Sequence, residues 1–180
     1  MSLDRLFLDE SQAFLRGEWL PKIEAALDVL GDDGLWWRPN DRSNSAGTLC
    51  VHLAGNVRQW IVAGVGDAPD IRDRPAEFAT TGGRSRADVV ADLRAAVDES
   101  CAVLDGLDEA ALLATHSIQG GTPTGLHAVY HAVEHFAMHA GQIVWIAKAR
   151  ADGDLAFYDD ADGPLPQRRW IATPGGPLAP

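Results

Sequence analysis

The stretch from residue 122 to residue 150 constrains the fold more than any other part of the chain. It opens with Thr122-Pro123, a pair typical of a helix start, with Thr as N-cap and Pro at the first helical position. A helix that is apolar almost all round must be buried on several sides. The sequence therefore predicts a long helix that packs against other elements on several sides. Its apolar residues surround the helix almost completely: Val129, Val133, Phe136, Ile143, Val144, Trp145 and Ile146.

Three more segments have the apolar spacing of amphipathic helices, and no segment alternates convincingly as a strand does. Pro21 falls inside the first helix and should kink or divide it, because proline lacks the amide donor and clashes with the preceding turn. Four long helices without strands predict an all-α four-helix bundle. The predicted helices span residues 3–30, 46–64, 85–104 and 122–150.

Capping residues and loop composition set the predicted boundaries. Ser45 is a plausible N-cap for the second helix, and Ser85 with Asp88 forms a capping box at the start of the third. The connection between these two helices is long for a bundle, so we expect it to cover something. We expect residues 1–150 to form the bundle. Residues 151–180, rich in Asp, Gly and Pro, should form an irregular tail that packs on the bundle or is partly disordered.

Composition excludes several classes of function. The net charge of −11, without a Lys/Arg cluster, argues against nucleic-acid binding. No run approaches the roughly 18–20 uncharged residues of a membrane span, and the N-terminus lacks signal-peptide organisation. A cytoplasmic location is therefore expected. Cys50 and Cys101 form no CxxC motif and should be buried, reduced and structural.

Four of the six histidines recur every fourth residue within the last predicted helix. Residues four apart lie on one helix face, about 6 Å from each other, where two neutral imidazoles can bind one metal ion. Each such step also drifts by about 40° around the axis, so the first and last histidines point about 120° apart and cannot share an ion. Only adjacent pairs qualify: His127/His131, His131/His135 or His135/His139.

A third ligand must come from a facing helix, because two helical histidines leave coordination positions open. His52, at the edge of the apolar stripe of the second helix, is the clearest candidate, and His116 is a weaker one. Cys50 points about 160° away from His52 on a helix and is not expected to bind the same ion. The alternative is that His127 and His131 form a hydrogen-bonded core pair or support the ligands from behind.

The run HAVEHFAMHAGQI, with the earlier HLAGNVRQW, resembles the DinB-like (damage-inducible) superfamily of metal-binding four-helix bundles. The shared pattern is His-x3-His-x3-His-x-Gly-Gln on the last bundle helix and one His in the second helix. The resemblance covers roughly residues 3–150. It implies a three-histidine site of His52, His135 and His139 that holds zinc or nickel, and homodimers formed through bundle helices. Met138 and Ala140 stand where the commoner family ending has His and Arg.

The resemblance implies a metal-dependent enzyme with a small-molecule substrate, either a transferase that uses a low-molecular-weight thiol or a hydrolase. The alternative is a non-catalytic stress-response bundle that binds a metal or ligand. Glu134 is more readily a salt-bridge or interface residue than a general base. Core packing is the first expectation for Trp36, Trp37 and Trp60, and a solvated surface for Arg58, Arg72 and Arg74. Further candidates for the pocket are His131, Gln142, Asn56, Trp60 and Glu134.

Overall fold

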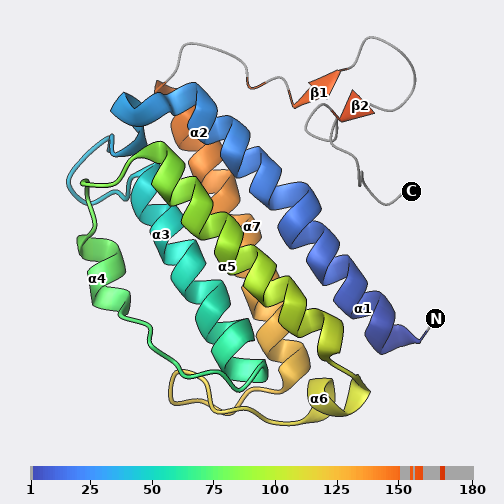
Figure 1. Cartoon of the computed structure of the whole chain (residues 1–180). Helices are drawn as coiled ribbons and strands as arrows, with labels where there is room; N and C mark the ends of the chain where they lie inside the picture. Colours follow the sequence, from blue (N-terminus) through green and yellow to red (C-terminus); the bar gives the residue numbers. More distant parts are fainter. Residues whose placement is uncertain (1, 151–154, 156, 160–166, 169–180) are drawn as a thin grey trace.

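The computed structural model describes residues 2–150, 155, 157–159 and 167–168. Within these residues, four long helical segments pack side by side as an all-α bundle, which confirms the predicted fold class (Figure 1). The first segment comprises α1 (Leu3–Gln12), the π-helix η1 (Ala13–Trp19) and α2 (Leu20–Leu35); the second is α3 (Ala46–Val57) with the π-helix η2 (Arg58–Val65); the third is α5 (Arg86–Gly106) and the fourth α7 (Gly125–Arg150).

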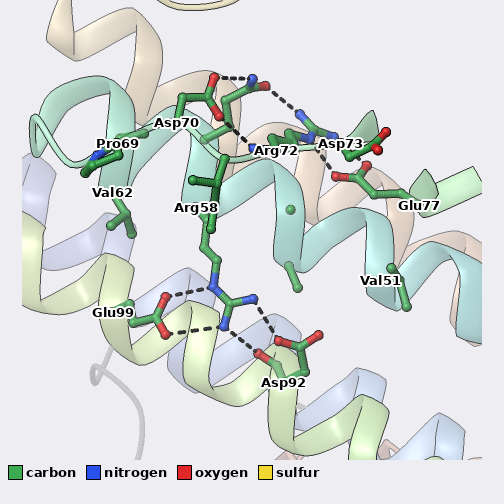
Figure 2. A pocket seen from close by; sticks show the side chains of 15 residues that line it. Val51, Arg58, Val62, Pro69, Asp70, Arg72, Asp73, Glu77, Asp92 and Glu99 are labelled. Atoms are coloured by element: carbon green, nitrogen blue, oxygen red, sulfur yellow. Dashed lines mark hydrogen bonds and ion pairs between the residues drawn. The ribbon is translucent and has the colours of Figure 1, made fainter. Parts of the chain in front are cut away.

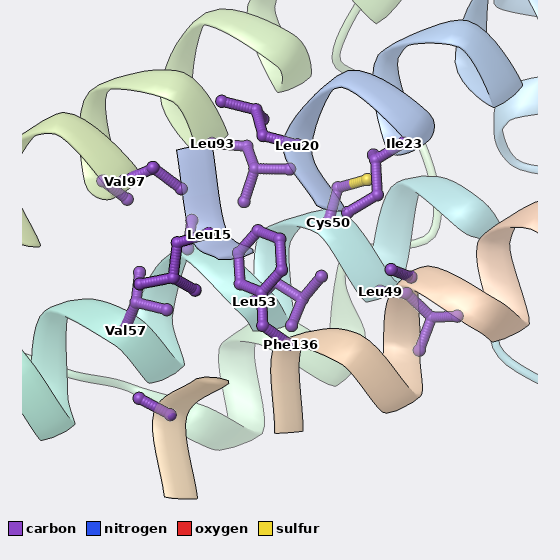
Figure 3. Close-up of a cluster of buried hydrophobic side chains, with 14 of the residues drawn as sticks. Leu15, Leu20, Ile23, Leu49, Cys50, Leu53, Val57, Leu93, Val97 and Phe136 are labelled. Atoms are coloured by element: carbon purple, nitrogen blue, oxygen red, sulfur yellow. The ribbon is translucent and has the colours of Figure 1, made fainter. Parts of the chain in front are cut away.

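The core of the bundle is apolar and draws side chains from all four segments. Phe136 of α7 is fully buried, among side chains from the three other segments (Figure 3). Cys50 and Cys101 are buried free thiols, as predicted, and burial raises the pKa of Cys50 to about 12. The apolar side chains drawn around Phe136 include Leu15, Leu20, Ile23, Leu49, Leu53, Val57, Leu93 and Val97.

Pro21 does not divide the first helix. The chain instead widens into the π-helix η1 immediately before Leu20, and Pro21 lies in the first turn of α2, where its missing amide donor is tolerated. The regular part of α2 is interrupted at Gly31, whose φ of +61° is a left-handed conformation that glycine adopts without strain. One more helical turn follows and ends at Leu35. The predicted helix end at residue 30 therefore coincides with the interruption at Gly31 and not with the end of α2.

The predicted start of the fourth helix is wrong by a few residues. Thr122 and Pro123 belong to a short antiparallel turn in which the amide of His116 donates to the carbonyl of Pro123 (2.9 Å). The helix begins at Gly125, and the Thr124 hydroxyl accepts from the amide of His127 (3.2 Å). The other caps are as predicted, because Ser45 caps α3 and Ser85 with Asp88 forms the capping box of α5.

Two short helices and one strand pair were not predicted. The helix α4 (Arg74–Ala79) lies in the long connection and packs beside α3, and α6 (Glu109–Leu113) follows α5 (Figure 1). The strands β1 (Tyr158–Asp159) and β2 (Gln167–Arg168) pair antiparallel. Most of the predicted irregular tail, 151–180, lies outside the described residues. The described helices include none with the length and apolarity to cross a membrane, and a cytoplasmic location stays a prediction.

An ion network joins the second and third segments of the bundle. The Arg58 guanidinium donates to Asp92 (2.7 Å) and to Glu99 (2.7 Å), both on α5 (Figure 2). Arg84 also donates to Asp92 (3.1 Å). Burial alone would raise the pKa of Asp92, but the hydrogen bonds from the two arginines lower it below its ordinary value. Arg58 is thus a structural residue and not simply a solvated one.

We predict that Asp92→Asn lowers the free energy of unfolding at pH 7 by about 1 kcal/mol, because a partly buried carboxylate with two arginine partners is lost. The folded-state pKa of Asp92 lies below its unfolded value, so its contribution is present above about pH 4 and is lost as the pH falls through the folded-state pKa. Urea denaturation at pH 7 and at about pH 3 checks this. Asp98→Asn, also on α5, removes an exposed ion pair with Arg16 of η1; it is the control and should change stability less.

Candidate metal centre

Three histidine side chains converge at the interface of α3 and α7. The Nε2 atom of His135 lies 3.2 Å from Nε2 of His52 and 3.2 Å from Nε2 of His139. Among the described residues, this is the group of His, Cys, Asp and Glu side chains whose ligand atoms all lie within 4.8 Å of one another. The structure therefore brings together the three histidines that the resemblance implied.

The spacing of these nitrogens fits a transition-metal ion. Nitrogen–metal bonds of 2.0–2.1 Å at tetrahedral angles place the ligand nitrogens about 3.3 Å apart, close to the two observed separations. His52 and His139 are buried and His135 is half-buried, so the donors are held inside the protein. Three imidazole donors on rigid helices are a set suited to a divalent transition metal.

A buried carboxylate fixes the orientation of His52. Nδ1 of His52 lies 2.8 Å from Oε2 of Glu77, which belongs to α4. Because a carboxylate accepts, Nδ1 is the protonated nitrogen and the lone pair of Nε2 points toward the other two histidines. The short helix α4 therefore helps to build the site, which explains what the long connection covers.

Arg72 completes this arrangement behind the histidine. Its guanidinium donates to both oxygens of Glu77, at 2.7 and 2.9 Å (Figure 2). The side chains of Arg72 and Glu77 are only 4% and 8% exposed. Burial alone would raise the pKa of Glu77, but the hydrogen bonds from Arg72 and His52 lower it, so the group is a carboxylate at neutral pH. The prediction that Arg72 is a solvated surface residue is wrong.

His139 is oriented from its own helix. Its Nδ1 lies 2.7 Å from Oε1 of Gln142, three residues further along α7. An amide oxygen accepts, so Nδ1–H of His139 donates and the lone pair of Nε2 faces the centre. Two of the three histidines thus turn an unprotonated Nε2 toward the centre, and the prediction that Gln142 lies beside these histidines agrees with this geometry.

Burial keeps the imidazoles of α7 uncharged. Burial first, and then the neighbouring His139 and His52, lower the pKa of His135 to about 3. The pKa of His139 is also lowered, because burial outweighs the opposing hydrogen bond to Gln142. A neutral imidazole offers a lone pair, whereas an imidazolium does not. Both side chains are therefore in the ligand form at neutral pH.

Gly55 makes room for the carboxylate on the outer face of α3. A Cβ atom at this position would lie 1.9 Å from Oε1 of Glu77 and 3.3 Å from Nε of Arg72. Real carbon and oxygen atoms do not approach so closely, so any side chain at this position would displace Glu77. The absence of a side chain allows Glu77 to lie across the helix and reach His52.

The first two histidines of the last helix lie outside the centre. His131 is half-buried, and its ring lies 4.0 Å from the Trp60 ring, centroid to centroid. Burial lowers the pKa of His131. His127 is exposed, with its ring 6.4 Å from that of Trp60. His116 lies elsewhere, and its Nε2 donates to the carbonyl of Ala111 (3.1 Å).

The remaining predicted pocket residues divide into buried and exposed groups. Asn56 and Trp60 are buried on the second segment of the bundle. Glu134 is exposed and is not among the converging side chains. Arg74 is exposed too, with its guanidinium 4.8 Å from the centroid of the Phe78 ring. Trp36 and Trp37 are partly buried and pack against the core, as first expected.

Two residues beside His52, Glu77 and Phe78, were not predicted from the sequence. The centroid of the Phe78 ring lies 4.6 Å from that of the His52 ring. Glu77 and Phe78 both lie on α4, a helix of six residues, too short to give a clear periodic signal. The available signal was local: Asp73 followed by Arg74-Pro75 is an N-cap followed by proline in the first turn, and the Asp73 side chain does accept from the amide of Ala76 (3.0 Å).

Comparison with known proteins agrees with this architecture. A DinB-like protein (YjoA) from Bacillus subtilis has a similar structure, with a TM-score of 0.59 and 17% sequence identity over 78% of this chain and 91% of that one. At this identity the likeness shows the fold, and the predicted fold, a four-helix bundle like that of a DinB-like protein, is confirmed. No curated protein matches the chain. The family model described as "Protein of unknown function (DUF1572)" matches residues 3–158, and the chain belongs to this family.

Proposed function

We propose that the protein is a metal-dependent enzyme, of the thiol S-transferase or hydrolase type, with a divalent transition metal held by His52, His135 and His139. The observation that carries this proposal is the convergence of three Nε2 atoms at metal-ligand spacing. Two of them are turned toward the centre by acceptors on the opposite ring nitrogen. Zinc and nickel are the ions proposed.

The charges around the centre support a catalytic role. Three neutral ligands leave at least one coordination position for a water molecule or substrate, the arrangement of catalytic zinc sites. A divalent ion held in this way can lower the pKa of a bound water or bind a thiol as its thiolate. The negative charge of Glu77 is balanced by the positive charge of Arg72, so this pair adds almost no net charge behind His52. A divalent ion at the centre would therefore keep its positive charge and favour an anionic ligand.

His131 is the side chain that we propose as proton acceptor. It lies one turn before His135 on α7, with its ring 5.5 Å from the His135 ring, centroid to centroid. Burial lowers its pKa, so at neutral pH the ring is uncharged and can accept a proton. Packing against Trp60 would hold the ring in place beside the centre.

One observation favours the alternative, a non-catalytic bundle that binds a metal or ligand. Glu77 is locked by Arg72 and His52, and Glu134 is exposed, so neither carboxylate lies free beside the three histidines. An enzyme of this kind would depend on His131 or on the substrate for proton transfer. The two candidates therefore differ in whether the metal-loaded protein turns over a substrate.

We predict that the purified protein binds close to one equivalent of zinc or nickel per chain, and that His135→Ala or His139→Ala abolishes this binding, because each removes one of three ligands. Elemental analysis after reconstitution and desalting gives the stoichiometry. His116→Ala and His127→Ala, which change histidines outside the centre, are matched controls and should bind like the wild type. Equal loading of all four variants would exclude the proposed site.

We predict that a small thiol added to the cobalt-substituted protein produces a thiolate-to-metal charge-transfer absorption in the near ultraviolet, because the open position takes an anionic sulfur ligand. Thiol-transfer and ester-hydrolysis assays on the zinc-loaded protein, with His135→Ala as the inactive control, then separate the enzyme types. Full metal loading without any thiol binding or turnover would favour the non-catalytic alternative.

We also propose that two copies pair along α7, as the resemblance implies. Large apolar residues are exposed on this helix, and burying them between two copies would be favourable. They are Leu126, Tyr130, Met138 and Trp145.

We predict that the wild type is a dimer in sedimentation velocity and that the double variant Tyr130→Glu, Trp145→Glu is a monomer. Val29→Glu, at an exposed apolar residue of α2, is the control; a wild-type monomer would refute the pairing.

A further inference from the structure

Two of the three histidines have a hydrogen-bond acceptor on Nδ1, whereas His135 has none. Its Nδ1 atom is buried and has no hydrogen-bond partner. A buried donor without a partner costs free energy, so such an atom calls for an explanation. Histidines that bind metal almost always donate from the other ring nitrogen, which leaves the metal-binding nitrogen free of a proton. The site therefore lacks one orienting contact at His135.

A buried acceptor that also lacks a partner lies on α3. Asn56 is only 3% exposed, and its Oδ1 is another buried atom without a hydrogen-bond partner. The other unpartnered atoms of this kind in the described part of the chain are the nitrogens Arg5 Nη2 and Trp19 Nε1, on the first segment of the bundle. Asn56 Oδ1 is thus the one acceptor among these buried atoms, and the side chain lies on the helix that carries His52.

The packing of α3 against α7 places the two groups at the same level. His52 contacts His135 and His139, and Trp60, eight residues later, contacts His131 and His127. The two segments therefore run antiparallel. Asn56 is halfway between His52 and Trp60, one turn from each, on the same helix face. Its level on α7 is consequently that of His131 and His135.

We propose that Asn56 is a positioning residue for His135, accepting a hydrogen bond from Nδ1 directly or through one water molecule. Asn56 would then accept a hydrogen bond from Nδ1 of His135, as Glu77 accepts one from His52 and Gln142 accepts one from His139. With all three Nδ1 atoms donating, all three Nε2 lone pairs face the centre. The inference rests on the proposed function for its role in metal binding, but the contact itself does not require the metal.

A double-mutant cycle in the metal-free protein tests the contact. Asn56→Leu keeps the volume and removes the amide, and we expect it to lower Tm by roughly 3–6 °C relative to the wild type, since a buried ring nitrogen loses its partner. In the His135→Leu background the same change should have little effect, because the ring is gone. An equal decrease of Tm in both backgrounds would overturn the inference.

Zinc affinity tests the role in metal binding. Asn56→Leu should weaken zinc binding about 10- to 100-fold, as loss of the partner behind a ligand does, and Gln142→Leu should act similarly on His139. Asn56→Asp keeps an acceptor oxygen and should bind zinc within a few-fold of the wild type. Asn44→Leu, at an exposed asparagine, is the matched control and should bind normally.

The outcomes separate the two proposals. If the wild type binds no zinc, the proposed function fails, while the Tm cycle still decides whether Asn56 contacts His135. If zinc binds and Asn56→Asp weakens it as much as Asn56→Leu, side-chain shape and not the acceptor matters, and the inference fails. If Asn56→Leu binds zinc as tightly as the wild type, Asn56 has no positioning role.

Discussion

The buried ion pair of Arg72 and Glu77 is the interaction on which the centre depends. Charges removed from water lose several kcal/mol of solvation each, and only close, well-directed partners offset that loss. Here both oxygens of Glu77 receive hydrogen bonds from Arg72, and Oε2 also accepts from His52. The pair lets a carboxylate stay ionised inside the protein, and the carboxylate in turn sets which nitrogen of His52 faces the other histidines.

This arrangement links a surface connection to the interior of the bundle. The segment between η2 and α5 contributes Arg72 and Glu77, whereas the three converging histidines come from α3 and α7. Gln59 of η2 accepts from Arg72 at 2.8 Å, which ties the arginine to the end of the second segment as well. The rigid helices hold the positions of the histidines, and the connection, through Glu77, sets which nitrogen of His52 carries the proton. Loss of the connection's fold would therefore remove the group that orients His52.

Much of this could be predicted from the sequence because the signals are periodic. The spacing of apolar residues identified four helices, and helical drift reduced the four histidines of α7 to adjacent pairs. His52 was the clearest third candidate from its place on the second helix, and the choice of His135 with His139 as its partners came from the resemblance. The parts that escaped prediction depend on contacts between distant residues. Nothing local distinguishes Arg72, buried against Glu77, from Arg74, which is exposed; only the packing of α4 on α3 separates them.

Gly55 carries a consequence for how this protein can change over evolution. The position faces Glu77 so closely that the two residues are not independent, because any larger residue at 55 would force the Glu77 carboxylate to move from its place beside His52. A relative that carries alanine or serine at position 55 would have to orient its equivalent of His52 by another group. Family members that have glycine at position 55 and glutamate at position 77 would thus be those that orient this histidine with a carboxylate. Members that lack this pair could keep all of the histidines and orient this one differently.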